Sequence, residues 1–122
     1  MTQDPYSDKV RELFARPAHA GCISGARSVR LEDQGVRLCL CAQAGGDLIQ
    51  ALSFKAWGCP HLIAAAEAFC DAFEGRPVTE LLEFEASGLM ESLSVPVEKT
   101  GRILVLEDAV RTLGKSFCDE SN

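Results

Sequence analysis

The sequence predicts an α+β domain in which helices cover one face of a small three-stranded antiparallel sheet. Apolar and polar residues alternate over three segments between residues 26 and 56, and turns of polar and glycine residues separate these segments. After Gly58 the apolar period changes from two to about 3.6, which is typical of helices. Strands with short connections favour an antiparallel meander with one buried face.

The first predicted element is a helix from about Ser7 to Ala15. Ser7 can cap its amino end, Val10 and Leu13 share one face, and Pro17 ends it. A polar stretch over 18–25 follows and is expected to be a loop. The predicted strands are Ala26–Glu32, Val36–Gln43 and Leu48–Ala56.

Helical periodicity dominates the second half of the chain. Pro60 suits the first turn of a long helix, because a proline lacks the N–H that would be unpaired there, and Gly75 ends that helix. The predicted helices are Pro60–Glu74, Val78–Phe84, Ala86–Leu93 and Arg102–Phe117. The last is expected to bury Leu104, Val105, Ala109, Val110 and Leu113. With 122 residues, the chain fits a single domain over 1–122, with a core of about 6–117 and a loose tail at 119–122.

The charge balance excludes several classes of partner. Twelve basic and 18 acidic residues give a net charge of −6. Nucleic acids and anionic membrane surfaces require clustered Lys and Arg, so neither is an expected partner. No apolar run approaches the roughly 18 residues that a membrane span needs. The polar start, residues 1–9, resembles neither a secretory signal nor a transit peptide, and the expected location is cytoplasmic.

Six cysteines are spread over the chain without a C-x-x-C pair, at Cys22, Cys39, Cys41, Cys59, Cys70 and Cys118. A domain with 47% hydrophobic residues does not need a disulfide scaffold. Cys39 and Cys41 share one strand face, where they could bind a metal, become oxidised or pack half-buried. Cys70 is expected to be a small core residue.

Three segments resemble the NifU-like, IscU-type family of iron–sulfur cluster assembly scaffolds. They are the opening Tyr6–Gly21, the strand-to-helix turn Phe54–Cys59, and Val95–Lys99 followed by Glu107–Val110. They occur in the family's order between Tyr6 and Phe117. The resemblance implies a SufE/NifU-like fold and a role in iron–sulfur cluster assembly.

The resemblance also implies a ligand set. In the family, three cysteines and an aspartate, with a neighbouring histidine, hold zinc or a nascent [2Fe–2S] cluster, since cluster irons favour thiolate sulfur. This sequence keeps the central cysteine as Cys59. Glu32 falls at a missing cysteine and Gln34 at the missing aspartate, while Gly101 and Arg102 replace a His-Cys pair. A fixed Arg cation in place of a thiolate would repel Fe²⁺ or Zn²⁺.

Cys59 is therefore the main candidate for binding iron, a cluster or zinc. It precedes a helix whose amino end favours a thiolate, although it could equally be packed under the turn. His61, Glu32 and Asp33 are candidate additional metal ligands. The alternatives are a surface histidine for His61 and a polar hairpin turn for the two carboxylates.

Pro96 and Lys99 are candidate partner-binding residues. They lie in the segment that a dedicated Hsp70-type chaperone recognises in the family, but here Val97-Glu98 replaces a Pro-Val pair. The alternative is a loop that connects two helices.

Two functions remain open. The first is a scaffold-like protein that binds iron or a [2Fe–2S] cluster through Cys59, or accepts a persulfide there from a cysteine desulfurase. The second is a metal-free interaction or regulatory protein that keeps the scaffold fold and binds the cluster-assembly machinery. Neither is an enzyme, because the sequence contains no Gly-rich phosphate loop and no nucleotide fingerprint, and its two histidines suggest no catalytic triad.

Overall fold

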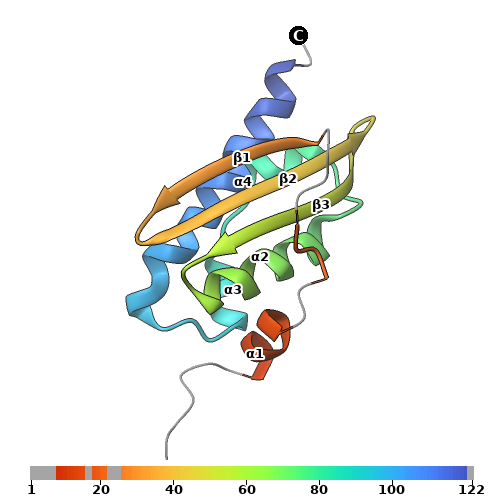
Figure 1. Cartoon of the computed structure of the whole chain (residues 1–122). Coiled ribbons are helices and arrows are strands. Elements are labelled where there is room, and N and C mark those ends of the chain that lie inside the picture. Colours follow the sequence, from red (N-terminus) through yellow and green to blue (C-terminus); the bar gives the residue numbers. More distant parts are fainter. Residues whose placement is uncertain (1–7, 16–17, 22–25, 121–122) are drawn as a thin grey trace, which may run out of the picture.

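The computed structural model in Figure 1 describes residues 8–15, 18–21 and 26–120. A three-stranded antiparallel sheet in the order β1-β2-β3 lies over the helices. The elements are α1 (Asp8–Ala15), β1 (Arg27–Asp33), β2 (Val36–Gly45), β3 (Leu48–Trp57), α2 (Pro60–Phe73), the 3₁₀ helix η1 (Val78–Glu83), α3 (Ser87–Ser92), the 3₁₀ helix η2 (Val97–Lys99) and α4 (Thr100–Glu120).

Helices α2 and α4 cover one face of the sheet, so the predicted α+β architecture is confirmed. The inner face carries the apolar residues of the strands: Leu31 of β1 lies opposite Leu38 of β2, and Leu40 of β2 lies opposite Phe54 of β3. Leu38, Leu40 and Phe54 are buried in a core with Phe69 and its neighbours, and the partly buried Leu31 packs against that core. Helix α2 packs against β3, and α4 against β1 and β2.

A two-residue turn at Gln34 and Gly35 joins β1 to β2. Both residues have positive φ angles, 53° and 74°, which is the backbone geometry of a type I′ hairpin turn. The Asp33 carboxylate accepts a hydrogen bond of 2.8 Å from the backbone N–H of Gln34. The polar turn was predicted, but β1 extends one residue further, to Asp33.

Residues 18–21 form a loop that runs alongside the outer edge of β3. The N–H of Gly21 donates to the carbonyl of Phe54 at 2.7 Å, and the N–H of Phe54 donates to the carbonyl of His19 at 2.9 Å. Ala20 and Phe54 form a parallel bridge. The predicted loop is confirmed at 18–21, where a single bridge ties it to β3, and its remainder at 22–25 lies outside the described residues.

The final helix starts earlier and ends later than predicted. It begins at Thr100 and includes Asp119 and Glu120, so the expected tail is wrong at these two positions. Leu104 is 39% exposed, against prediction, and Ile103 is buried in its place. The predicted helix 78–84 is a 3₁₀ helix, while Ser7 and Pro17 lie outside the described residues. Within the described parts of the chain, no helix has the length and apolarity to cross a membrane.

Candidate functional site

Three segments far apart in the sequence meet at one end of the sheet: the β1–β2 turn, the turn from β3 into α2, and the start of α4. A side chain on Gly58 would begin 2.8 Å from the carbonyl oxygen of Gly35. A side chain on Gly101 would begin 3.1 Å from Oε1 of Gln34. These are the segments that contain the ligand positions inferred from the sequence, so the fold brings those segments together.

Gly58 makes the meeting of the first two segments possible. Its φ angle of 106° lies in the region that disfavours any residue with a side chain. Its missing Cβ also leaves room for the backbone of Gly35 and Val36. The glycine thus sets both the direction of the turn and the position of the cysteine that follows it.

Cys59 is the N-cap residue of α2, and its carbonyl accepts the N–H of Ile63 at 3.2 Å. Pro60 occupies the first helical position. The Cys59 side chain is only 2% exposed and belongs to the apolar core. Its sulfur lies 4.0 Å from Nδ1 of His61. Cys59 is therefore packed under the turn from β3 into α2, as one of the two interpretations of the sequence proposed.

His61 is buried, so its interpretation as a surface histidine is wrong. Burial lowers the pKa of its imidazole, the positive charges of Lys99 and Arg102 lower it further, and Glu98 partly opposes them. His61, which contacts Cys59, therefore lies near positive charges at the end of η2 and the start of α4.

The two candidate carboxylates have other roles in the hairpin. Glu32 lies opposite Arg37 on the outer face of the sheet, where its carboxylate pairs with the Arg37 guanidinium at 3.3 Å. Asp33 caps the turn, as described above. Within the described residues, no group of three or more His, Cys, Asp and Glu side chains is arranged to hold a metal ion.

The side chains at the family's ligand positions do not fit an iron–sulfur cluster or a zinc ion. A cluster needs four ligands, mostly thiolates, and tetrahedral zinc likewise needs four donors. Gly101 offers no donor atom, Arg102 brings a positive charge, and the amide of Gln34 fills the space beside Gly101. Cys59 is the one thiol among these positions.

Pro96 and Lys99 delimit a tight, exposed turn before α4. The N–H of Lys99 donates to the carbonyl of Pro96 at 2.9 Å, and Val97 between them is 88% exposed. The turn is accessible to a partner, and partner binding by Pro96 and Lys99 stays a prediction.

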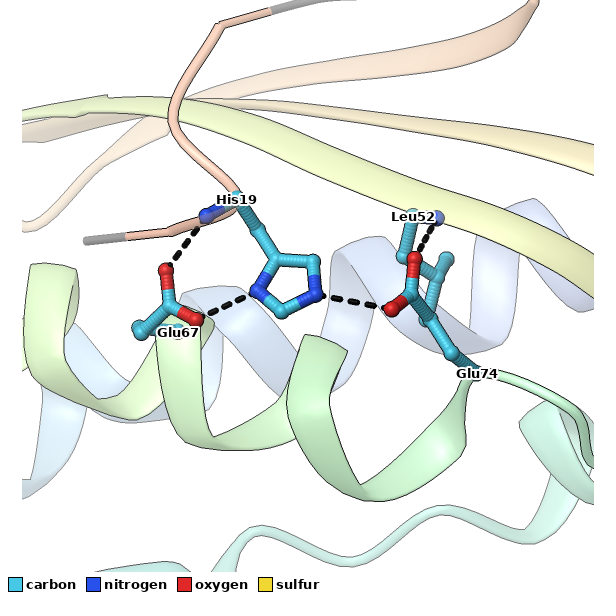
Figure 2. Close-up of polar contacts among 4 residues, drawn as sticks. All are labelled: His19, Leu52, Glu67 and Glu74. Atoms are coloured by element: carbon cyan, nitrogen blue, oxygen red, sulfur yellow. Dashed lines mark hydrogen bonds and ion pairs between the residues drawn. The ribbon is translucent and has the colours of Figure 1, made fainter.

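Figure 2 shows a polar cluster that the sequence did not reveal, built around His19. The backbone N–H of His19 donates to Glu67 Oε1 at 2.7 Å, and its ring Nδ1 contacts Glu67 Oε2. On the other side, Nε2 lies 2.8 Å from Glu74 Oε1, while Glu74 Oε2 accepts the N–H of Leu52 at 2.8 Å. The cluster fastens residues 18–21 and β3 to helix α2.

The two carboxylates control the ionisation of His19. Burial acts to lower its pKa, but the hydrogen bonds and negative charges of Glu67 and Glu74 outweigh that effect and raise the pKa above its ordinary value. No spacing in the sequence signals this cluster, because His19 is 48 residues from Glu67 and 55 residues from Glu74.

The strand cysteines and Cys70 are buried. The sulfurs of Cys39 and Cys41 are 3.9 Å apart on the outer face of β2, and Cys41 is disulfide-bonded. Cys70 is the expected core residue, and burial raises the pKa of its thiol.

Residues 5–118 match the sequence profile of the NifU-like N-terminal domain, and the chain belongs to that family. The iron–sulfur cluster assembly protein IscU of Plasmodium falciparum is 26% identical over 118 residues, which cover 92% of this chain and 73% of that protein. The cluster assembly scaffold protein IscU of Buchnera aphidicola is 25% identical and covers 96% and 97% of the two chains. The crystal structure of a NifU-like protein from Brucella abortus superposes with a TM-score of 0.70 at 11% identity, over 88% of this chain and 90% of that one.

Proposed function

We propose that this chain acts in iron–sulfur cluster assembly through protein contacts made by its scaffold fold, without holding a cluster by its own side chains. The observation that carries the proposal is the contrast between backbone and side chains at one end of the sheet. The three ligand-bearing segments meet there, but Gly101, Arg102 and Gln34 supply no thiolate, imidazole or carboxylate.

Family membership supports the cluster-assembly part of this proposal. Relatives that align with nearly the whole chain are named as cluster assembly proteins. A protein with the same fold can occupy the place of a working scaffold on a cysteine desulfurase or on another component of the machinery. It would then regulate assembly by competition.

The chemistry of the site supports the metal-free part. Metal binding releases the proton of a thiol and requires further donors at about 2.0 to 2.3 Å from zinc. The Cys59 sulfur lies 4.0 Å from Nδ1 of His61, well beyond a coordination distance, and the residue is buried in the core. Lys99 and Arg102 place positive charge near the same pair and so oppose a divalent cation.

Anaerobic reconstitution tests the metal-free part directly. The full chain is incubated with iron and sulfide, desalted, and measured by visible absorption and by elemental analysis for iron and zinc. We expect a colourless protein with far less than one metal ion per chain. A stoichiometric, coloured product that disappears in Cys59→Ser would overturn the proposal and favour an iron-carrying role of Cys59.

A competition assay tests the assembly part. A cysteine desulfurase is mixed with a labelled working scaffold, and this chain is added as unlabelled competitor. We expect displacement of the scaffold with equal potency for the natural chain and Cys59→Ser, since the buried sulfur takes no part. A chain that neither binds the desulfurase nor displaces the scaffold would contradict this role.

An alternative function follows from the Cys59–His61 contact, which places an imidazole beside the thiol. In that function Cys59 accepts sulfur from a desulfurase persulfide, by thiolate attack on the outer sulfur and release of the desulfurase thiolate. Mass spectrometry after incubation with desulfurase and cysteine would detect a gain of one sulfur atom on Cys59. We expect no such gain, because Cys59 is buried in the core and only 2% exposed.

A further inference from the structure

The outer face of the sheet, which the helices leave uncovered, contains a cavity of about 440 Å³ that is separate from the Cys59 region. A cavity of this volume lies in the range of small-molecule sites. Its lining residues come from all three strands: Arg30, Leu31, Glu32, Arg37, Leu38, Cys39, Lys55 and Trp57.

Strand register arranges the polar lining residues in two rows. Cys39 of β2 lies opposite Arg30 of β1 and Lys55 of β3, so a cation stands on each side of the thiol. In the next row, Arg37 of β2 lies opposite Glu32 and Trp57. Because alternate residues of a strand share a face, both rows point outward.

The charge of the cavity is opposite to the charge of the chain. Three cations and one carboxylate line it, whereas the whole chain carries −6. Glu32 pairs with Arg37. Within the described residues, Arg30 and Lys55 make no ion pair, so their two charges remain available to a ligand.

Trp57 adds an aromatic side chain to the cationic lining of the cavity. Its side chain is 49% exposed, and the Arg37 guanidinium lies 5.7 Å from the ring centroid. Arg37 is thus held between an indole ring and a carboxylate, which fixes the direction of its donors. A half-exposed indole beside cations suits a molecule with both a planar ring and an anionic group.

We propose that this cavity binds a small organic phosphate, with the phosphate between Arg30 and Lys55 and a planar group against Trp57. Arginine and lysine are the side chains that recognise phosphate oxygens most strongly. The two available cations match a phosphate monoester, which carries close to two negative charges at neutral pH. A concave site favours a small molecule over the flat surface of an acidic protein.

The single tryptophan of the chain reports on the cavity, so fluorescence can test the proposal directly. The full chain is titrated with adenosine 5′-monophosphate, with inorganic phosphate, and with neutral adenosine. We expect a saturable change in Trp57 fluorescence with the nucleotide and at least tenfold weaker responses with the other two. We also expect the nucleotide response to weaken as salt is added, because salt screens exposed charges.

Matched variants separate this site from general charge effects. Arg30→Gln and Lys55→Gln should each weaken nucleotide binding at least fivefold, whereas Lys115→Gln, an exposed cation on α4, should leave it unchanged. Circular dichroism verifies that each variant is folded. The proposal is overturned if the nucleotide gives no saturable response, if the three variants respond alike, or if an acidic peptide binds more tightly than the nucleotide.

Discussion

The surroundings of helix α2 shift the pKa values of two histidines in opposite directions, downward at its amino end and upward toward its carboxyl end. At the amino end, Cys59 and His61 are buried beside each other near Lys99 and Arg102, and the pKa of the imidazole is lowered. Toward the carboxyl end, His19 is bonded to two carboxylates and its pKa is raised.

The comparison shows that a backbone arrangement can persist without the side chains that a metal site requires. At the amino end the backbone gathers the ligand segments, but the side chains form no donor set. At the carboxyl end, side chains from distant segments form a connected hydrogen-bonded network, whose role is to hold the edge of the sheet to α2. Buried polar groups that are fully partnered stabilise a fold, and incomplete sets do not.

The largest expected effect comes from removing the buried carboxylate of Glu67, in the middle of α2. Glu67→Ala leaves the backbone N–H and the ring of His19 without their buried partner, and should lower the free energy of unfolding by about 3 kcal/mol. Urea denaturation measures this change. Glu67→Gln keeps an acceptor and should cost less, while Glu80→Ala at an exposed position should change little. Equal costs for Glu67→Ala and Glu80→Ala would contradict the role of the cluster.

The next effect concerns the backbone contact at the amino end. Gly58→Ala should cost about 2 kcal/mol or more, because the new Cβ meets the carbonyl of Gly35 and the φ angle is positive. Gly75→Ala is the matched control, since its φ is 89° but no atom lies near the added carbon. Its cost, measured in the same urea titration, reports the backbone strain alone. If both variants lower the free energy of unfolding equally, the contact between residue 58 and the carbonyl of Gly35 does not contribute to the cost.

A pH titration distinguishes the two histidines. The raised pKa of His19 means that its stabilisation is fully present below its ordinary value of 6.5 and is lost as the pH rises through its folded-state pKa. The lowered pKa of His61 acts in the opposite direction, with stability lost as the pH falls below 6.5. Subtracting the unfolding free energy of His19→Gln from that of the natural chain cancels the contribution of His61. The difference should shrink from acid to alkaline pH, and a growing difference would contradict the assignment.

The smallest effect is expected at Gly101. Its added Cβ would meet only the end of the Gln34 side chain, which can rotate away, and alanine is a better helix former than glycine. Gly101→Ala should therefore change the unfolding free energy by less than about 0.5 kcal/mol. A loss comparable to that of Gly58→Ala would mean that Gln34 is held rigidly against α4.

Local pattern predicted most of the fold. The alternation in β2 assigned Leu38 and Leu40 to the core, and Pro60 placed the start of α2 correctly. Leu104 was wrongly predicted to be buried, because the buried face of α4 includes Ile103 instead. The helix also starts two residues earlier than expected.

The site was harder to predict, because burial and long-range contacts decide its chemistry. The sequence identified Cys59 and the replaced ligand positions, but spacing cannot show that Cys59 and His61 are buried together. It also cannot show that Glu32 pairs with Arg37 on the other face of the sheet. His19 was missed because its partners are contributed by a helix about 50 residues away, and only the folded chain brings them within bonding distance.

The strand-like pairing of residues 18–21 has a consequence for self-association. The unpaired backbone groups of an edge strand can recruit a strand from another molecule, which is a common route to aggregation. Here Ala20 and its neighbours occupy that position on β3, and the opposite edge strand carries the charges of Arg30 and Glu32, which discourage recruitment. The His19 cluster, by fastening residues 18–21 to α2, keeps backbone groups of β3 at this edge paired within the chain.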